Sequence, residues 1–182
     1  PKEAVNSPHA PVFSIQTSDP DSKPLPYYKI APDTYFFFGN IAEVDGINRG
    51  FNGNAGFVVT RDGVLVLDAL GTPSLGRRMI AAIREVTRQP IRYLVISHAH
   101  PDHYFGASAF ADIPGIRIIS HVGTQEYVYS PTIERSVAYR KVFLPGEMEN
   151  FHAVVPDLLI GGGNPAHVAV KMGGKTCEIY DT

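Results

Sequence analysis

Residues 98–103, with the sequence HAHPDH, directly follow an apolar run at residues 91–97. This run is short and rich in β-branched and other apolar residues, which predicts a buried strand. The six residues therefore begin where a strand ends. At that place an α/β sheet exposes backbone and side chains to a ligand. The pattern predicts an α/β protein with a functional site at the end of this strand.

Four of these six residues have side chains that can bind a transition metal: His98, His100, Asp102 and His103. In an extended segment, residues two apart point the same way, so the first two imidazoles can face one ion. Pro101 turns the chain, and Asp102 is then predicted to cap a helix that runs to about residue 110. Imidazole and carboxylate suit Zn²⁺ or Fe²⁺. This many ligands would suit two ions about 3.5–4 Å apart. The alternative is that the histidines are structural or exposed.

This stretch, after its apolar strand, resembles the HxHxDH signature of the metallo-β-lactamase superfamily. Residues 54–59 and 63–68 resemble the opening strands of that family, the second ending in Asp68. A Gly-Thr-Pro turn at residues 71–73 and a predicted helix follow, as in the family. The resemblance covers roughly residues 27–182. It implies half of an αββα sandwich, namely a mixed β-sheet with flanking helices.

The resemblance implies a metal-dependent hydrolase. In such an enzyme a metal-bound hydroxide attacks a carbonyl of a β-lactam, a thioester or a lactone. The implied cofactor is one or two Zn²⁺ ions, with iron as the alternative. Asp102 would be the catalytic residue, binding a second metal or orienting the nucleophile. Two alternatives stay open: an iron-dependent oxygenase of a sulfur substrate with the same fold, and a non-catalytic half-domain that assembles with a partner.

Three more residues are candidates for the site. Asp68 is expected to hold His98 or His100 by accepting a ring N–H, or else to cap the following turn. Phe51 lies in a glycine- and asparagine-rich loop that corresponds to a flap in the family, so it could contact substrate, or the loop could be a plain connection. Tyr104 could reach the substrate or simply pack in the core.

Other elements are predicted from alternation, helical spacing and turn residues. His121 ends one strand and is expected to cap the next helix. Cys177 alternates with apolar residues, so it is expected to be a small buried residue inside a strand and not a metal ligand. The predicted elements are strands at 28–30, 34–38, 56–60, 64–68 and 115–120, helices from 72–73 and from 130–131, and a hairpin at 167–170 and 176–180.

Length and charge bound the remaining possibilities. A chain of 182 residues fits one domain. A formal net charge of −2 gives no reason to expect nucleic acid or a membrane as partner, so a small-molecule substrate is expected. A single cysteine excludes an intrachain disulfide. The start at Pro1 fits a removed leader or a trimmed end, which favours a periplasmic or secreted location over a cytoplasmic one.

The two ends of the chain add further expectations. Residues 1–26 hold six of the fifteen prolines and are expected to form an extended arm, with the domain at 27–182. The chain stops at Thr182, before the third histidine, bridging aspartate and last histidine that the resemblance implies. We therefore expect weak or no activity from the chain alone. An uncovered apolar sheet face would favour a homodimer or association with a missing C-terminal half.

Overall fold

The computed structural model describes residues 23–182. The predicted arm therefore lies almost entirely outside the described residues. Its last part is docked on the domain, because Leu25 is buried and its N–H donates to the carbonyl of Arg78 at 3.2 Å. None of the helices in residues 23–182 combines the length and the apolarity that crossing a bilayer requires.

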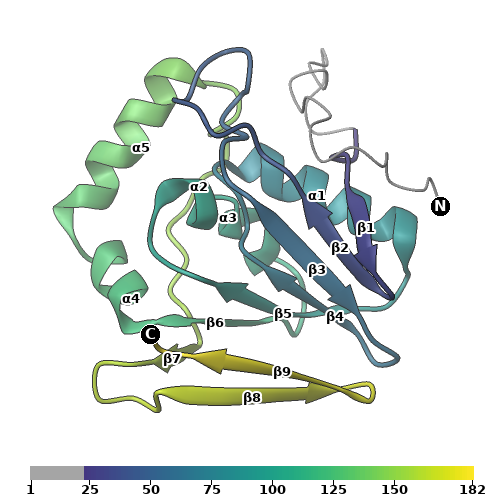
Figure 1. Cartoon of the computed structure of the whole chain (residues 1–182). Coiled ribbons are helices and arrows are strands. Elements are labelled where there is room, and N and C mark those ends of the chain that lie inside the picture. Colours follow the sequence, from purple (N-terminus) through teal and green to yellow (C-terminus); the bar gives the residue numbers. More distant parts are fainter. Residues whose placement is uncertain (1–22) are drawn as a thin grey trace.

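Seven strands form one mixed sheet in the order of the chain (Figure 1). Strands β1 to β4 pair antiparallel, and β4 to β7 pair parallel. The predicted hairpins at the first four strands are confirmed. The strands are β1 Tyr28–Ala31, β2 Thr34–Phe37, β3 Ala55–Val59, β4 Val64–Leu67, β5 Ile91–Ile96, β6 Arg117–His121 and β7 Leu158–Ile160.

Helices cover one face of this sheet and bury the larger core (Figure 1). The longest helix, α1, begins as predicted, with Pro73 in its first turn and the hydroxyl of Thr72 accepting from the N–H of Leu75 at 3.1 Å. The helices are α1 Pro73–Val86, α2 Pro101–Tyr104, α3 Ala107–Ala111, α4 Val122–Val128 and α5 Pro131–Phe143.

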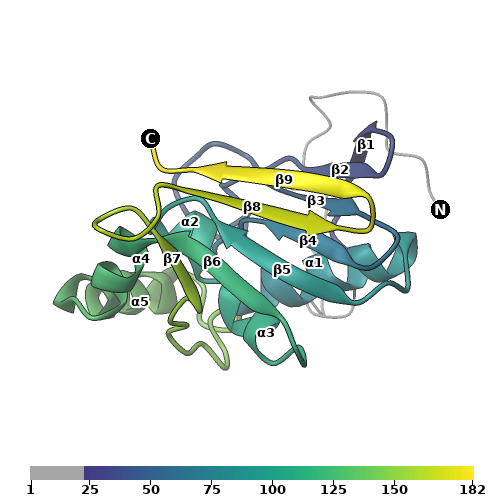
Figure 2. The ribbon, with the colours of Figure 1, turned by 90° about the horizontal axis from the view of Figure 1, so that it is seen from below.

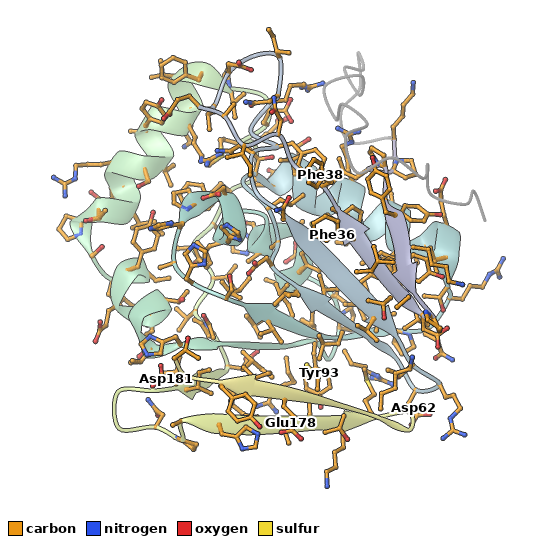
Figure 3. All side chains as sticks on the ribbon, in the orientation of Figure 1. Phe36, Phe38, Asp62, Tyr93, Glu178 and Asp181 are labelled. Atoms are coloured by element: carbon orange, nitrogen blue, oxygen red, sulfur yellow. The ribbon has the colours of Figure 1, made fainter. Side chains whose placement is uncertain are left out.

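The hairpin of β8 (His167–Met172) and β9 (Lys175–Tyr180) covers the other face over the middle strands (Figure 2). Tyr93 points from β5 toward it, and Asp62 lies at its turn (Figure 3). The expectation of an uncovered apolar sheet face is therefore wrong for this part. The second cluster lies between the layers, with Leu65, Val95, Ile119 and Val170 buried.

The same face stays open over β1 to β4, beyond the hairpin. Leu67 is 47% exposed and Ile30 is 62% exposed. Together with neighbours such as Phe36 and Val58 they line an apolar groove of about 270 Å³, and Asp68 and His103 line it as well. Figure 3 shows Phe36 on this stretch of the sheet, with Phe38 just past its end. An apolar surface therefore adjoins the histidine region.

The helix after the HAHPDH stretch differs from the prediction. His100 is the N-cap, Pro101 is the first helical residue and Asp102 the second, so Asp102 is not the cap. The predicted single helix is broken into α2 and α3 at Gly106. The N–H of Gly106 donates to the carbonyl of Leu70 at 2.9 Å, which ties the break to the loop after β4.

Gly106→Ala is expected to lower the free energy of unfolding by about 1–3 kcal/mol, the usual cost of overpacking. A Cβ at this position would lie 1.8 Å from the carbonyl oxygen of Ala69, so the two loops would have to separate. Urea unfolding measures the effect. Gly146→Ala is the control, because a Cβ there meets nothing within 4 Å. Equal stability of the two variants would contradict the close approach.

Candidate active site at the carboxyl ends of the parallel strands

The candidate site lies where β4 and β5 end side by side. Asp68 directly follows β4, and residues 97–103 directly follow β5. Because these strands are parallel, their carboxyl ends lie at one edge of the sheet. The N–H of Asp68 donates to the carbonyl of Val95 at 2.8 Å, so the pairing carries on past β4.

Asp68 is 5% exposed and joins the two loops. Its carboxylate accepts from the N–H of Ser97 at 2.7 Å, from the Ser97 hydroxyl at 2.9 Å and from Nδ1 of His103 at 2.8 Å. The prediction named His98 or His100 as its partner, which is corrected here: it holds His103. Asp68 reaches His98 only through Ser97, whose hydroxyl lies 2.9 Å from Nδ1 of His98.

A local fold explains this choice of partner. The turn of α2 carries His103 back toward β4, and its carbonyl accepts from the N–H of Ala69 at 2.9 Å. The main chain of His103 is thus held next to Asp68, and this places its ring within hydrogen-bond distance of the Asp68 carboxylate. Sequence spacing alone could not show this, because it depends on the parallel pairing of β4 with β5. Ser97 is a site residue that the sequence analysis missed, although it directly precedes the HAHPDH stretch.

Three imidazole rings gather at this edge. The ring centroids of His98 and His100 lie 4.6 Å apart, and those of His98 and His103 lie 4.3 Å apart. Nε2 of His103 lies 3.3 Å from Oδ2 of Asp102. The structure thus brings together all four predicted ligands and Asp68.

The carboxylates set the charge of this cluster. Hydrogen bonds to Asp102 and Asp68 raise the pKa of His103 to about 9. The bond to His103 lowers the pKa of Asp102. Partial burial, and then the positive charges of His103 and His100, lower the pKa of His98. Near pH 7 the site therefore holds a protonated His103 beside a neutral His98, whose lone pair is available to a metal ion.

The stability of the metal-free chain is expected to fall as the pH rises from about 6.5 toward about 9. The pKa of His103 is raised in the folded state to about 9. Its contribution to the free energy of unfolding is therefore complete at a pH below the pKa of the unfolded chain, and is lost as the pH rises through the folded-state pKa. Urea unfolding at about pH 6 and about pH 9.5 measures this loss. His103→Asn should show a smaller decline; an equal decline in both proteins would assign it to other groups.

In residues 23–182, no three histidine, cysteine, aspartate or glutamate side chains are arranged around a common point as ligands of a metal ion. The donor set nevertheless suits a borderline divalent ion. Asp68 holds Nδ1 of His103, an arrangement typical of a histidine whose other nitrogen binds metal. That nitrogen is now paired with Asp102, so a bound ion would replace this contact.

The two predicted substrate contacts are corrected. Phe51 is 3% exposed and packs in the core beneath the loop between β2 and β3. Tyr104 is 1% exposed; its hydroxyl donates to the carbonyl of Val154 at 2.7 Å and accepts from the N–H of that residue at 2.6 Å. Both side chains face the core because the loop and α2 turn their apolar residues inward. Neither is available to a substrate.

The expectation for His121 is confirmed. It is the N-cap of α4, and its Nδ1 accepts from the N–H of Gly123 at 3.0 Å. Its other ring nitrogen lies 3.3 Å from a carboxylate oxygen of Asp181. Cys177 is half-buried in β9 and packs against the cluster between the two layers. These residues stabilise the fold.

The fold and the site together define a mixed α/β protein with a histidine- and carboxylate-rich centre at the carboxyl ends of parallel strands. The model of the metallo-beta-lactamase superfamily matches residues 48–173. The chain belongs to the metallo-beta-lactamase superfamily. No curated protein matches the sequence.

Solved structures share this fold. The stereoselective inverting sec-alkylsulfatase Pisa1 from Pseudomonas sp. is 18% identical with a TM-score of 0.60, over 85% of this chain and 27% of that one. A HARLDQ-motif metallo-beta-lactamase from Cronobacter sakazakii is 19% identical with a TM-score of 0.54, over 85% and 49%. A metallo-beta-lactamase from Pontibacter korlensis is 14% identical with a TM-score of 0.53, over 85% and 59%. The chain therefore spans between about a quarter and three fifths of their lengths.

Proposed function

We propose that this chain carries the histidine centre of a metal-dependent hydrolase that acts on a small molecule. The gathering of His98, His100 and His103 beside Asp102 is the observation that carries the proposal. Members of the superfamily include hydrolases such as sulfatases and β-lactamases, which agrees with it. The proposed substrates are compounds with a hydrolysable carbonyl: a β-lactam, a thioester or a lactone.

The four ligand candidates, His98, His100, Asp102 and His103, would hold one or two zinc ions, with iron as the alternative. A divalent cation bound there would supply Lewis acidity, which would polarise the carbonyl whose carbon is attacked. With an ion on the other ring nitrogen, Asp68 would keep the neutral ring of His103 in one tautomer by accepting its Nδ1–H. Asp102, with its lowered pKa, is a carboxylate that can accept a proton from an attacking water or bind a second ion.

Metal content and hydrolysis together test this proposal. The purified 182-residue chain is incubated with zinc or iron, desalted and analysed for metal, and then assayed with one β-lactam, one thioester and one lactone. We expect bound metal, and any hydrolysis is expected to be slow and to stop with a chelator and with His98→Ala. Failure to bind either metal, or hydrolysis that survives both treatments, would contradict the proposal.

The expected homodimer, or association with a C-terminal half, stays a prediction. The face concerned is the open apolar stretch over β1 to β4, where Leu67 and Ile30 are exposed. Light scattering after size exclusion measures the mass of the chain. A monomer at all concentrations would exclude the homodimer.

A further inference from the structure

A second cavity, of about 350 Å³, lies between α5 and the loop that joins β2 to β3. Figure 1 shows this loop beside one end of α5. Pro101 lines the cavity and lies between His100 and Asp102 in the chain. The cavity therefore adjoins the histidine centre. The polar and charged side chains that line it are those of Glu43, Asn52, Thr132, Arg135, Ser136 and Arg140, with Tyr139.

Arg140 is the unusual member of this lining. It is 4% exposed, and its Nη1 is buried with no hydrogen-bond partner among the described residues. Its guanidinium lies over the ring of Phe105, 5.7 Å from the centroid. The chain makes room for it with glycines, because a Cβ at Gly71 would lie 2.7 Å from Nη1 and one at Gly50 would lie 3.2 Å away. A buried guanidinium nitrogen without a hydrogen-bond partner costs free energy, so its retention points to a ligand.

The charges around Arg140 favour an anion. Arg135 lines the same cavity and donates to the hydroxyl of Thr132 at 3.3 Å. Glu43 is exposed in the lining. Asp102 attracts Arg140 through space, but the two make no hydrogen bond. The lining itself carries two guanidiniums and one exposed carboxylate and is therefore cationic, while Asp102, outside the lining, offsets part of the charge of Arg140. The planar fork of arginine matches the paired oxygens of a carboxylate, a sulfate or a phosphate.

We propose that Arg140 and Arg135 form a subsite for an oxyanion of the substrate, separate from the bond that is hydrolysed. That the anion is part of a substrate rests on the proposed hydrolase function. That Arg140 and Arg135 bind an anion does not depend on that function. Pro101 places this subsite next to the ligand candidates, so one molecule can span both. The substrate class then narrows to small molecules that carry a carboxylate, sulfate or phosphate group beside the hydrolysable carbonyl.

Direct anion binding to the metal-free chain tests this. Sodium sulfate, sodium phosphate and sodium acetate are titrated separately by calorimetry, with sodium chloride holding the ionic strength constant. We expect saturable binding of at least one of them. Each charge-assisted hydrogen bond lost should weaken it about tenfold or more. Arg135→Gln, an exposed position, should bind about tenfold more weakly, and Arg140→Gln should not bind measurably.

Two further variants sharpen the result. Arg88→Gln is the matched control, since Arg88 is exposed in the loop between α1 and β5 and does not line the cavity. Arg140→Lys keeps the charge but loses the fork, and should bind at least about tenfold more weakly than the parent. Should Arg140→Gln fail to fold, Arg135→Gln and Arg140→Lys decide the question.

Each outcome bears on one proposal. Binding of sulfate or phosphate assigns the subsite to a tetrahedral anion, and binding of acetate assigns it to a carboxylate. No saturable binding by the parent chain, or equal binding by the parent, Arg135→Gln and Arg140→Lys, would overturn the subsite. Zinc binding is measured on the same samples. If the parent chain binds an anion but no zinc, only the hydrolase proposal is overturned. If it binds zinc but no anion, only the subsite is overturned.

Discussion

His98→Ala and His100→Ala are each expected to lower the zinc affinity of the chain by more than about 100-fold. Losing a residue that only orients a metal ligand already costs about 10–100-fold, and these imidazoles are proposed to bind the ion themselves. Their ring centroids lie 4.6 Å apart at the end of β5. When one of the two imidazoles is removed, His103 is the only other histidine of the cluster that could take its place as a ligand.

A competition titration with a coloured chelator measures these affinities. His152→Ala is the matched control, because His152 is exposed in the segment after α5 and its side chain makes none of the contacts in the site. We expect it to bind zinc like the parent chain. If His98→Ala and His100→Ala bound zinc as tightly as the control, the metal would lie elsewhere, and the proposed function would lose its main support.

Asp68→Ala is expected to lower the free energy of unfolding by about 3–5 kcal/mol, the cost of breaking a buried ion pair from one side. The substitution leaves the N–H of Ser97 and Nδ1 of His103 without their acceptor, both in the partly buried joint between the two loops. It also puts alanine at a φ of 59°, a left-handed conformation that aspartate tolerates better.

Urea unfolding of the metal-free chain measures this loss near neutral pH, where His103, with its pKa of about 9, is protonated. Asp68→Asn should lose less, because its amide oxygen still accepts from Ser97 and asparagine tolerates the backbone conformation. Asp112→Ala, at an exposed position after α3, should change stability by less than about 0.5 kcal/mol. If Asp68→Ala lowered the free energy of unfolding no more than Asp112→Ala does, Asp68 would not be holding the two loops together.

Much of the site was predictable from neighbouring residues. His98 and His100 alternate past a buried strand, and this spacing is local, so the prediction that they lie together at its end needed no long-range contact. The partner of Asp68 was not predictable in the same way. Asp68 and His103 are 35 positions apart, and they meet because β4 pairs with β5 in parallel and α2 turns back over that pair.

Phe51 and Tyr104 show the opposite failure. Each lies in a segment with functional residues, and the sequence pattern did not show which way the side chain points. Packing decided it: both are buried, and the Tyr104 hydroxyl is paired with the backbone of Val154, 50 positions later in the chain. Arg140 was not singled out from the sequence, because its burial depends on the loops that carry Gly50 and Gly71, which only the fold brings together.

The sequence by itself determined the class of fold, the strand that leads into the site, and the four side chains suited to metal. These follow from alternation, turn residues and ligand chemistry, which act over a few residues. Only the tertiary structure decided that Asp68 holds His103, that the hairpin of β8 and β9 covers the middle strands on one sheet face, and that Arg140 is buried beside the site. Each of these three features depends on contacts between segments far apart in the chain, and such contacts cannot be predicted from a local sequence pattern.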